Sequence, residues 1–354
     1  MPSTLSQCID NPGVSRLRSM IDEARVVCIT CHVAPDGDAV GSSLGLAHLL
    51  TALGKAVTVI TPDAPPKNLM CLPGAKEILV GSHHPEAAAR AFARADLIFC
   101  LDFNELRRID RLAPMVEASS AARILIDHHL DPTSQVDLML SDPSSSSTCA
   151  LLYRLLERCG LDIMVGTEAA TCIYTGMMTD TGNFSYNASD PELYRIIAAL
   201  LAKGIDKDEI YRQVWFASSV SRMRLCAYAI LNKMTLYPEH GLAIIALSRE
   251  ELKDMGYVRG DTESLVNQPL ALPGIVWSVF LRQDDEEYVK VSMRSVGSFP
   301  VNLICRENFG GGGHLNAAGG DSRLTLEQTI AKVLEIAPAY DSLLDDRTLK
   351  PRQL

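Results

Sequence analysis

Short apolar runs alternate with segments of helical spacing between residues 20 and 130. Apolar, β-branched-rich runs separated by helical segments are typical of parallel strands joined by crossover helices. The predicted strands are residues 26–30, 56–60, 97–101 and 123–126. Residues 41–53, which begin with small side chains, are predicted to form the first crossover helix. This part of the chain therefore predicts an α/β fold with a parallel sheet.

The next part of the chain is predicted to be helical. The helical runs are residues 149–159, 168–178 and 191–202. The last run begins at Pro191, a residue favoured in the first turn of a helix. Residues 207–234 contain neither proline nor glycine, so we expect one long connecting helix there, with the domain boundary inside it.

After residue 235 the pattern changes to a second, mixed α/β arrangement. Strand-like runs at 242–247, 275–282 and 288–293 precede a glycine-rich segment, 310–320, and an amphipathic helix over 326–336. The expected organisation is an N-terminal parallel-sheet catalytic domain (1–206), a helical linker (207–234) and a smaller substrate-binding C-terminal domain (235–354). A chain of 354 residues is long enough for two such cores.

The composition is that of an ordinary globular protein, with 47% hydrophobic and 21% charged residues. A net charge of -10 argues against a broad basic surface for nucleic acid, although bound cations can reverse the field inside a cleft. No apolar segment reaches the roughly 20 residues of a membrane span, and no signal peptide is visible, so we expect a cytoplasmic protein. The ten cysteines show no CxxC pair and are expected to be reduced thiols.

Candidate chemistry gathers where the predicted strands end. The candidate ligands are His32, Asp36, Asp38, Asp102, Asp127, His128, His129 and, after a buried run, Asp180. Because the carboxyl ends of parallel strands share one edge of the sheet, these side chains can converge. A single aspartate at a strand end is more often a helix cap, but the whole series is difficult to explain as independent caps.

This set of side chains predicts a two-metal centre. Asp36, Asp38, Asp102 and Asp180 bring four negative charges, which two divalent cations would balance. Mixed carboxylate and imidazole ligands suit ions such as Mn²⁺. His128 and His129 are adjacent, so in extended chain they point to opposite faces. One should be a ligand and the other catalytic or phosphate-binding, and Asp127 can orient a histidine by a hydrogen bond.

The C-terminal domain offers a candidate anion site. Four glycines, 310–313, precede His314 and Asn316. Such a run alone is equally typical of a flexible turn, but with these neighbours it suits a backbone that closely approaches a phosphate. Arg294 could clamp a phosphate, or it could be a solvated arginine at a strand end.

These motifs resemble those of the DHH phosphoesterase superfamily over nearly the whole chain. The resemblance rests on His32 to Asp38, Asp102, the Asp127-His128-His129 triplet, Asp180 to Gly182 and the glycine-rich segment. Within that superfamily the chain is most similar to the NrnA-like bifunctional oligoribonucleases and 3'-phosphoadenosine 5'-phosphate phosphatases. The resemblance implies a metal-dependent hydrolase with a DHH domain, a DHH-associated C-terminal domain, two Mn²⁺ ions and a homodimeric state.

The resemblance also implies a role for each matching position. His32 and Asp36 hold one ion, Asp38, His128 and Asp180 hold the other, and Asp102 bridges them. His129, supported by Asp127, contacts the scissile phosphate. The positions implied to bind substrate are Arg294, Asn302, Gly312, Gly313, His314 and Asn316.

We therefore expect hydrolysis of short RNA and dinucleotides to 5'-mononucleotides, together with removal of the 3'-phosphate of 3'-phosphoadenosine 5'-phosphate. The alternatives are a phosphodiesterase for linear di-AMP or cyclic dinucleotides, and a DHH-type inorganic pyrophosphatase. A rival from another class is a nucleotide-sensing or RNA-binding module without catalysis. The complete set of metal-binding side chains argues against that module.

Overall fold

The sheet of the N-terminal part has six parallel strands in the order β3-β2-β1-β4-β5-β6. A computed structural model describes residues 9–132, 135–216, 218–258 and 260–344. The chain divides into two compact units, Met1–Ala217 and Ser218–Leu354. The strands of the first unit are β1 Val26–Thr30, β2 Ala56–Thr61, β3 Leu79–Val80, β4 Leu97–Leu101, β5 Ala122–Asp127 and β6 Leu138–Ser141. The predicted α/β class with a parallel sheet is confirmed.

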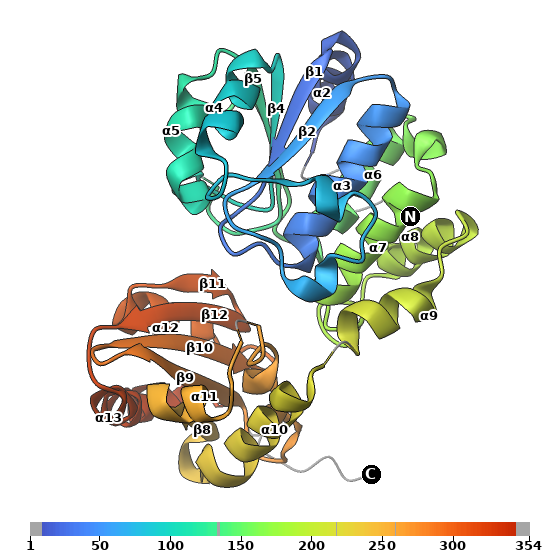
Figure 1. Cartoon of the computed structure of the whole chain (residues 1–354). Coiled ribbons are helices and arrows are strands. Elements are labelled where there is room, and N and C mark those ends of the chain that lie inside the picture. Colours follow the sequence, from blue (N-terminus) through green and yellow to red (C-terminus); the bar gives the residue numbers. More distant parts are fainter. Residues whose placement is uncertain (1–8, 133–134, 217, 259, 345–354) are drawn as a thin grey trace. The chain divides into compact units, whose positions relative to one another are not determined.

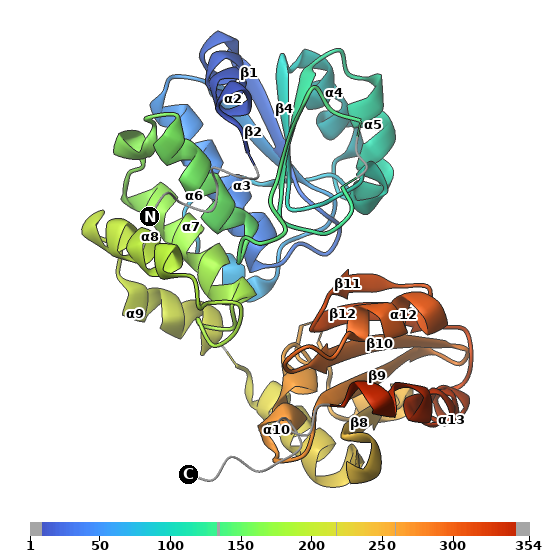
Figure 2. The ribbon, with the colours of Figure 1, turned by 180° about the vertical axis from the view of Figure 1, so that it is seen from behind.

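Helices cover both faces of this sheet (Figures 1 and 2). The α-helices of the first unit are α2 Asn11–Glu23, α3 Gly37–Ala52, α4 Pro85–Arg94, α5 Ala113–Ala118, α6 Thr148–Arg158, α7 Thr167–Asp180, α8 Pro191–Ala202 and α9 Lys207–Ile210. Leu97, Phe99 and Leu101 of β4 belong to the core shared with α3, α6 and α7, whereas Ile98 and Cys100 belong to the core shared with α4 and α5. Burial on both faces explains why the strand is a continuous apolar run rather than an alternating one.

Helix α3 begins four residues earlier than the sequence predicted. Asp36 is its N-cap, and Oδ1 of Asp36 accepts hydrogen bonds from the backbone N–H groups of Asp38 (3.0 Å) and Ala39 (3.1 Å). Aspartate is among the preferred N-cap residues because its side chain satisfies amides that lack a partner in the helix. Of the candidate ligands, Asp36 therefore caps the helix and Asp38 lies in its first turn.

The prediction of one long helix over 207–234 is wrong. Short helical segments take its place: α9, a π-helix at Tyr211–Trp215, α10 Val220–Tyr228 and a second π-helix at Ala229–Lys233. Ser219 starts α10 as its N-cap, with its side chain accepting a hydrogen bond from Arg222 N at 3.0 Å. A serine that competes for backbone amides favours a new helix start over a continuous helix.

The second unit holds a mixed six-stranded sheet in the order β11-β12-β10-β9-β8-β7, in which only the pair β8 and β9 is parallel among the described strands. Its strands are β7 Met234–Tyr237, β8 Leu242–Leu247, β9 Trp277–Asp285, β10 Tyr288–Ser295, β11 Gly312–His314 and β12 Ala317–Ser322. Its remaining α-helices are α11 Arg249–Asp254, α12 Val301–Phe309 and α13 Leu326–Ile336. A mixed α/β second domain was predicted, and the structure confirms it.

Short 3₁₀ segments complete the described chain. They are Lys67–Leu69, Ala75–Glu77, Leu106–Leu112, Asp162–Met164, Pro238–His240, Leu265–Ala271 and Ala337–Leu343. Among the described residues, no helix combines the length and apolar character needed to cross a bilayer. The nine cysteines of the described part are free thiols, and Cys71 alone of these nine is exposed.

Candidate metal centre

The candidate ligands meet where the strand order of the first sheet reverses. Chain order runs outward from β1 in both directions, so β1 and β4 are neighbours that come from the two halves of the sheet. In open α/β sheets, ligands bind at this switch point, beyond the carboxyl ends of the strands. His32 follows the end of β1, and Asp102 follows the end of β4. The topology therefore brings these two side chains together.

The first group of possible metal ligands is His32, Asp36 and Asp102. Nδ1 of His32 lies 2.8 Å from the carbonyl oxygen of Val33 and must donate a proton there. The other ring nitrogen, Nε2, lies 3.4 Å from Oδ2 of Asp102 and 3.8 Å from Oδ1 of Asp36. Fixing the tautomer in this way leaves Nε2 with the lone pair that a metal needs.

The second group is Asp38, Asp102 and His128. Nδ1 of His128 donates to the carbonyl oxygen of Ser145 at 3.2 Å. Its Nε2 lies 3.5 Å from Oδ2 of Asp180, 3.6 Å from Oδ1 of Asp102 and 3.8 Å from Oδ2 of Asp38. Asp180 is the last residue of α7, so the end of that helix supplies a further carboxylate.

Asp102 belongs to both groups. Its two carboxylate oxygens face different histidines, Oδ2 towards His32 and Oδ1 towards His128. The residue is 2% exposed and has a φ of 62°, a left-handed conformation that aspartate adopts more readily than most residues. One carboxylate placed between two groups of donors is the arrangement that a pair of cations would share.

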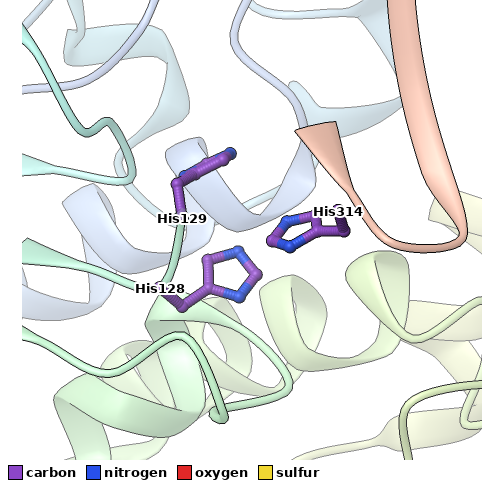
Figure 3. A group of neighbouring side chains, drawn as sticks. All are labelled: His128, His129 and His314. Atoms are coloured by element: carbon purple, nitrogen blue, oxygen red, sulfur yellow. The ribbon is translucent and has the colours of Figure 1, made fainter. Parts of the chain in front are cut away.

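His128 and His129 differ in environment although they are neighbours in sequence. The His128 side chain is 3% exposed among carboxylates, whereas that of His129 is 23% exposed. Their ring centroids lie 5.0 Å apart with planes at 64° (Figure 3). Nδ1 of His129 donates to Oδ1 of the fully buried Asp127 at 2.7 Å. Asp127 therefore holds the His129 ring, and the two histidines are suited to different tasks.

The carboxylates of this site bring more negative charge than its imidazoles offset. Burial lowers the pKa of His32, but the hydrogen bond with Asp102 and the charge of Asp36 outweigh it and raise that pKa to about 9. Burial also lowers the pKa of His128, and nearby carboxylates again raise it above the ordinary value. Burial together with the charges of Asp102 and other aspartates raises the pKa of Asp38 well above its usual range. Nearby carboxylates contribute to all three shifts, so the site carries an excess of negative charge.

The pKa of Asp102 moves in the opposite direction. Burial acts to raise it, but the hydrogen bond with His32 and the surrounding imidazoles lower it far below its usual range. An ionised, buried carboxylate flanked by imidazoles is a strong ligand for a divalent ion. The donor set of oxygens and imidazole nitrogens fits transition metals such as Mn²⁺, and two such ions would offset the excess charge.

The start of helix α6 was missed by the sequence analysis as part of this site. Backbone N–H groups of Thr148 and Cys149 donate to the two oxygens of Asp38, and the Thr148 hydroxyl donates to Asp102. The available signal was the run of four serines and a threonine before an apolar helix, which is typical of a helix start. That pattern alone does not say which carboxylates the helix faces.

In the second unit, the glycine-rich segment forms a strand. Gly312 to His314 pair with β12 as β11, and Figure 3 draws His314 at that strand. A Cβ atom on Gly311 would lie 1.9 Å from the Gly319 carbonyl oxygen, and one on Gly313 would lie 2.4 Å from the Ala317 oxygen. A Cβ on Gly312 would meet nothing within 4 Å. Several of these glycines are therefore required by close strand packing, and the anion site stays a prediction.

The other predicted substrate residues also lie in this unit. Arg294 is on β10, where its Nη1 donates to the carbonyl oxygen of Met293 at 2.9 Å. Nδ2 of Asn316 donates to Oγ of Ser295 at 2.8 Å and to the carbonyl oxygen of Gly297 at 3.0 Å. Asn302 is 8% exposed in α12. Asn316 therefore already stabilises the turn after β10, whatever else it binds.

Comparison with known proteins places these observations in a family. The DHH family N-terminal domain matches residues 26–177, and the DHHA1 domain matches residues 245–340. The Thermus thermophilus bifunctional oligoribonuclease and PAP phosphatase NrnA is 34% identical over 310 residues, which cover 87% of this chain and 88% of that protein. The Geobacillus thermodenitrificans cyclic-di-AMP phosphodiesterase GdpP is 26% identical over 92% of this chain but only 49% of its own length.

A crystal structure shows the same likeness in three dimensions. An exopolyphosphatase-related protein from Bacteroides fragilis superposes with a TM-score of 0.91 and 44% sequence identity. The match covers 95% of this chain and 98% of that one. Similarity at this level extends over both units and both sheets.

Proposed function

We propose that this chain, which belongs to the DHH family, hydrolyses short oligoribonucleotides and dinucleotides to 5'-mononucleotides. The second proposed activity is removal of the 3'-phosphate of 3'-phosphoadenosine 5'-phosphate. Relatives with both activities in their names match more than four fifths of this chain. The single observation that carries the proposal is Asp102, whose carboxylate joins the group that contains His32 to the group that contains His128.

The proposed metal assignment follows these groups. His32 and Asp36 would hold one ion, and Asp38, His128 and Asp180 would hold the other, with Asp102 contributing to both. When bound, such a pair of divalent ions would activate water as a nucleophile and offset the charge that develops on a phosphoryl oxygen. The hydrogen bonds from the Nδ1 atoms of His32 and His128 to carbonyl oxygens keep both Nε2 atoms available as ligands.

His129 is proposed to act on the substrate itself. Its hydrogen bond to Asp127 keeps the proton on Nδ1, so Nε2 is the atom that would face a phosphate. Asp127 would fix the orientation of the ring that faces the phosphate. The partial exposure of His129 suits a group that must meet a ligand.

The second unit is proposed to bind the nucleotide. Arg294 can pair with a phosphate through its guanidinium, and backbone N–H groups around Gly312 and Gly313 suit an anion. His314 would add a side-chain donor at the end of β11. Asn302 and Asn316 would support this surface, the latter by holding the turn that follows β10.

Manganese, a homodimeric assembly and a cytoplasmic location are parts of the same proposal. Carboxylate oxygens with imidazole nitrogens support Mn²⁺ over Mg²⁺ or Ca²⁺, which prefer oxygen ligands alone. The homodimer rests on the family resemblance, and sedimentation or light scattering would test it. Cytoplasmic location would be tested by cell fractionation.

The test is to measure products from di-adenylate, 3'-phosphoadenosine 5'-phosphate, pyrophosphate and an RNA of about 24 nucleotides, each with Mn²⁺. We expect turnover of the first two and little of the others. Replacement of Asp102 by Asn should abolish turnover because both ligand groups lose a charged donor. Asp96→Asn is a matched control, since Asp96 accepts backbone N–H bonds from Arg25 and Val26 at the start of β1. Equal cleavage of long RNA, or retained turnover in Asp102→Asn, would refute the proposal.

A second candidate is hydrolysis of cyclic or linear di-AMP. The supporting observation is the match to cyclic-di-AMP phosphodiesterases over 92% of this chain. Adding cyclic di-AMP and its linear product to the same assay would discriminate, because a dinucleotide hydrolase should prefer the linear form. Faster turnover of the cyclic form would favour this second candidate.

A further inference from the structure

Helix α6 directs three hydrogen-bond donors at two carboxylates of the candidate metal centre. The backbone N–H of Thr148 donates to Oδ2 of Asp38 at 2.6 Å, and that of Cys149 donates to Oδ1 of Asp38 at 2.9 Å. The side-chain hydroxyl of Thr148 donates to Oδ1 of Asp102 at 2.9 Å. Thr148 is thus bonded to both Asp38 and Asp102, and Asp102 belongs to the ligand group of His32 as well as to that of His128.

These bonds are made between fully or almost fully buried residues. Thr148 and Cys149 have no exposed surface, and Asp38 and Asp102 are 1% and 2% exposed. The helix start is itself fixed, because the Ser147 side chain caps it by accepting from Ala150 N at 3.0 Å. Donors held on a buried helix end cannot follow a carboxylate that moves, so they determine its position.

The hydroxyl bond limits how the Asp102 carboxylate can be turned. Oδ1 accepts from Thr148 and lies 3.6 Å from Nε2 of His128, whereas Oδ2 lies 3.4 Å from Nε2 of His32. Rotation about the bond that carries the carboxylate would take Oδ1 away from His128 and Oδ2 away from His32 together. A donor that fixes Oδ1 therefore keeps each oxygen directed at its own ligand group.

We propose that Thr148 is a positioning residue, whose hydroxyl orients the Asp102 carboxylate so that one oxygen serves each of two metal positions. This inference rests on the proposed function only in that the centre binds divalent cations. Outer hydrogen-bond partners of metal ligands typically contribute about 10- to 100-fold to metal affinity. The helix amides would hold Asp38 in the same way, but no side-chain substitution removes them.

The test is titration of Mn²⁺ into metal-free protein by calorimetry, with no substrate present. Thr148→Val keeps the shape and removes the hydroxyl, and we expect its Kd for Mn²⁺ to rise about 10-fold or more. Thr148→Ser restores a hydroxyl at the same position and should return the Kd to near that of the wild type. Thr148→Ala removes the hydroxyl without placing a methyl group beside Asp102, and it should weaken Mn²⁺ binding as Val does.

Thr329→Val is the matched control. Thr329 is also fully buried, and its hydroxyl donates within the second unit, to the carbonyl oxygen of Thr325 at 2.8 Å. This substitution should lower the melting temperature without changing the Kd for Mn²⁺. A merely structural role for Thr148 would give the same pattern in Thr148→Val, and that result would overturn the positioning role.

The outcomes separate this inference from the proposed function. An unchanged Kd in both Thr148→Val and Thr148→Ala would overturn the positioning role while leaving the hydrolase proposal intact. Wild-type protein that binds Mn²⁺ more tightly than Thr148→Val, but does not cleave di-adenylate, would support the positioning role and refute the proposed substrate. A wild-type chain that binds no Mn²⁺ would overturn both.

Discussion

Gly176 lies in α7 where that helix crosses α3 beside the candidate metal centre. A Cβ atom at this position would lie 2.2 Å from Sγ of Cys149, 2.9 Å from Oδ1 of Asp38 and 3.1 Å from its Cα. All three atoms belong to buried residues. Replacing Gly176 by alanine should therefore force α7 away from α3 and from the start of α6.

The cost follows from two opposing effects. Overpacking of a dense core costs about 1–3 kcal/mol, and the overlap with Cys149 is deep enough to place this site at the upper end. Alanine regains about 1 kcal/mol because it is the better residue inside a helix. The net loss is about 2 kcal/mol, which lowers the melting temperature of a unit of this size by about 4–8 °C.

Thermal unfolding of metal-free protein, followed by circular dichroism, measures the effect. The sharper test is a double-mutant cycle with Cys149→Ala, which removes the sulfur that the new methyl group meets first. We expect the double variant to be more stable than the sum of the single changes by about 1 kcal/mol or more. An unchanged melting temperature in Gly176→Ala, or additive effects in the cycle, would refute the steric argument.

Three further predictions concern other parts of the molecule. Gly311→Ala should destabilise the second unit by about 3 kcal/mol, because the new Cβ atom would collide with the backbone of β12. The new Cβ atom of Gly312→Ala would meet nothing within 4 Å, so this variant should keep the melting temperature. It should raise KM if the backbone of Gly312 contacts substrate. Equal melting temperatures for the two variants would contradict the predicted collision at Gly311. Asp127→Asn should lower kcat by about 10- to 100-fold, because His129 loses a charged partner. The Kd for Mn²⁺, measured by calorimetry, should stay constant. A parallel change in this Kd would instead make Asp127 a metal ligand. Burial lowers the pKa of His32, but carboxylates outweigh it and raise that pKa to about 9 in the metal-free fold. The unfolded value is about 6.5. The resulting stabilisation of the fold is therefore complete below about pH 6.5 and is lost as the pH rises through about 9. The melting temperature of EDTA-treated protein should fall across that window, and a rise there would be inconsistent with the charge excess.

Much of the fold could be predicted because its signals are local. The run 97–101 is apolar throughout since both faces of its strand are covered, and α8 and α13 have the predicted bounds. Pro191 begins α8, and Thr325 with Gln328 forms a capping box before α13, so each helix start is specified by adjacent residues. Such patterns depend on a few neighbouring positions, so they can be recognised without the tertiary structure.

The missed elements depend on distant partners. β3 has two residues and β6 has four, and each exists because a neighbouring strand, β2 or β5, supplies its hydrogen bonds. The glycines of β11 were not recognised as a strand, since their pairing with β12 decides it. The helix expected over 207–234 is broken because Ser219 caps the start of a new helix. The spacing of apolar residues does not reveal such a cap.

For the candidate site, the order of amino acids already specifies which side chains are available and that they follow strand ends. Ligand chemistry belongs to each single residue, and the periodicity of a strand is visible in a few neighbouring residues. How those side chains combine depends on the packing of strands and helices that are distant in the chain. The reversal of strand order beside β1 placed His32 against Asp102, and the packing of α6 brought Thr148 to the same carboxylate. Residues 46 positions apart in the chain meet there because helix packing on the sheet, and not local preference, sets their separation in space.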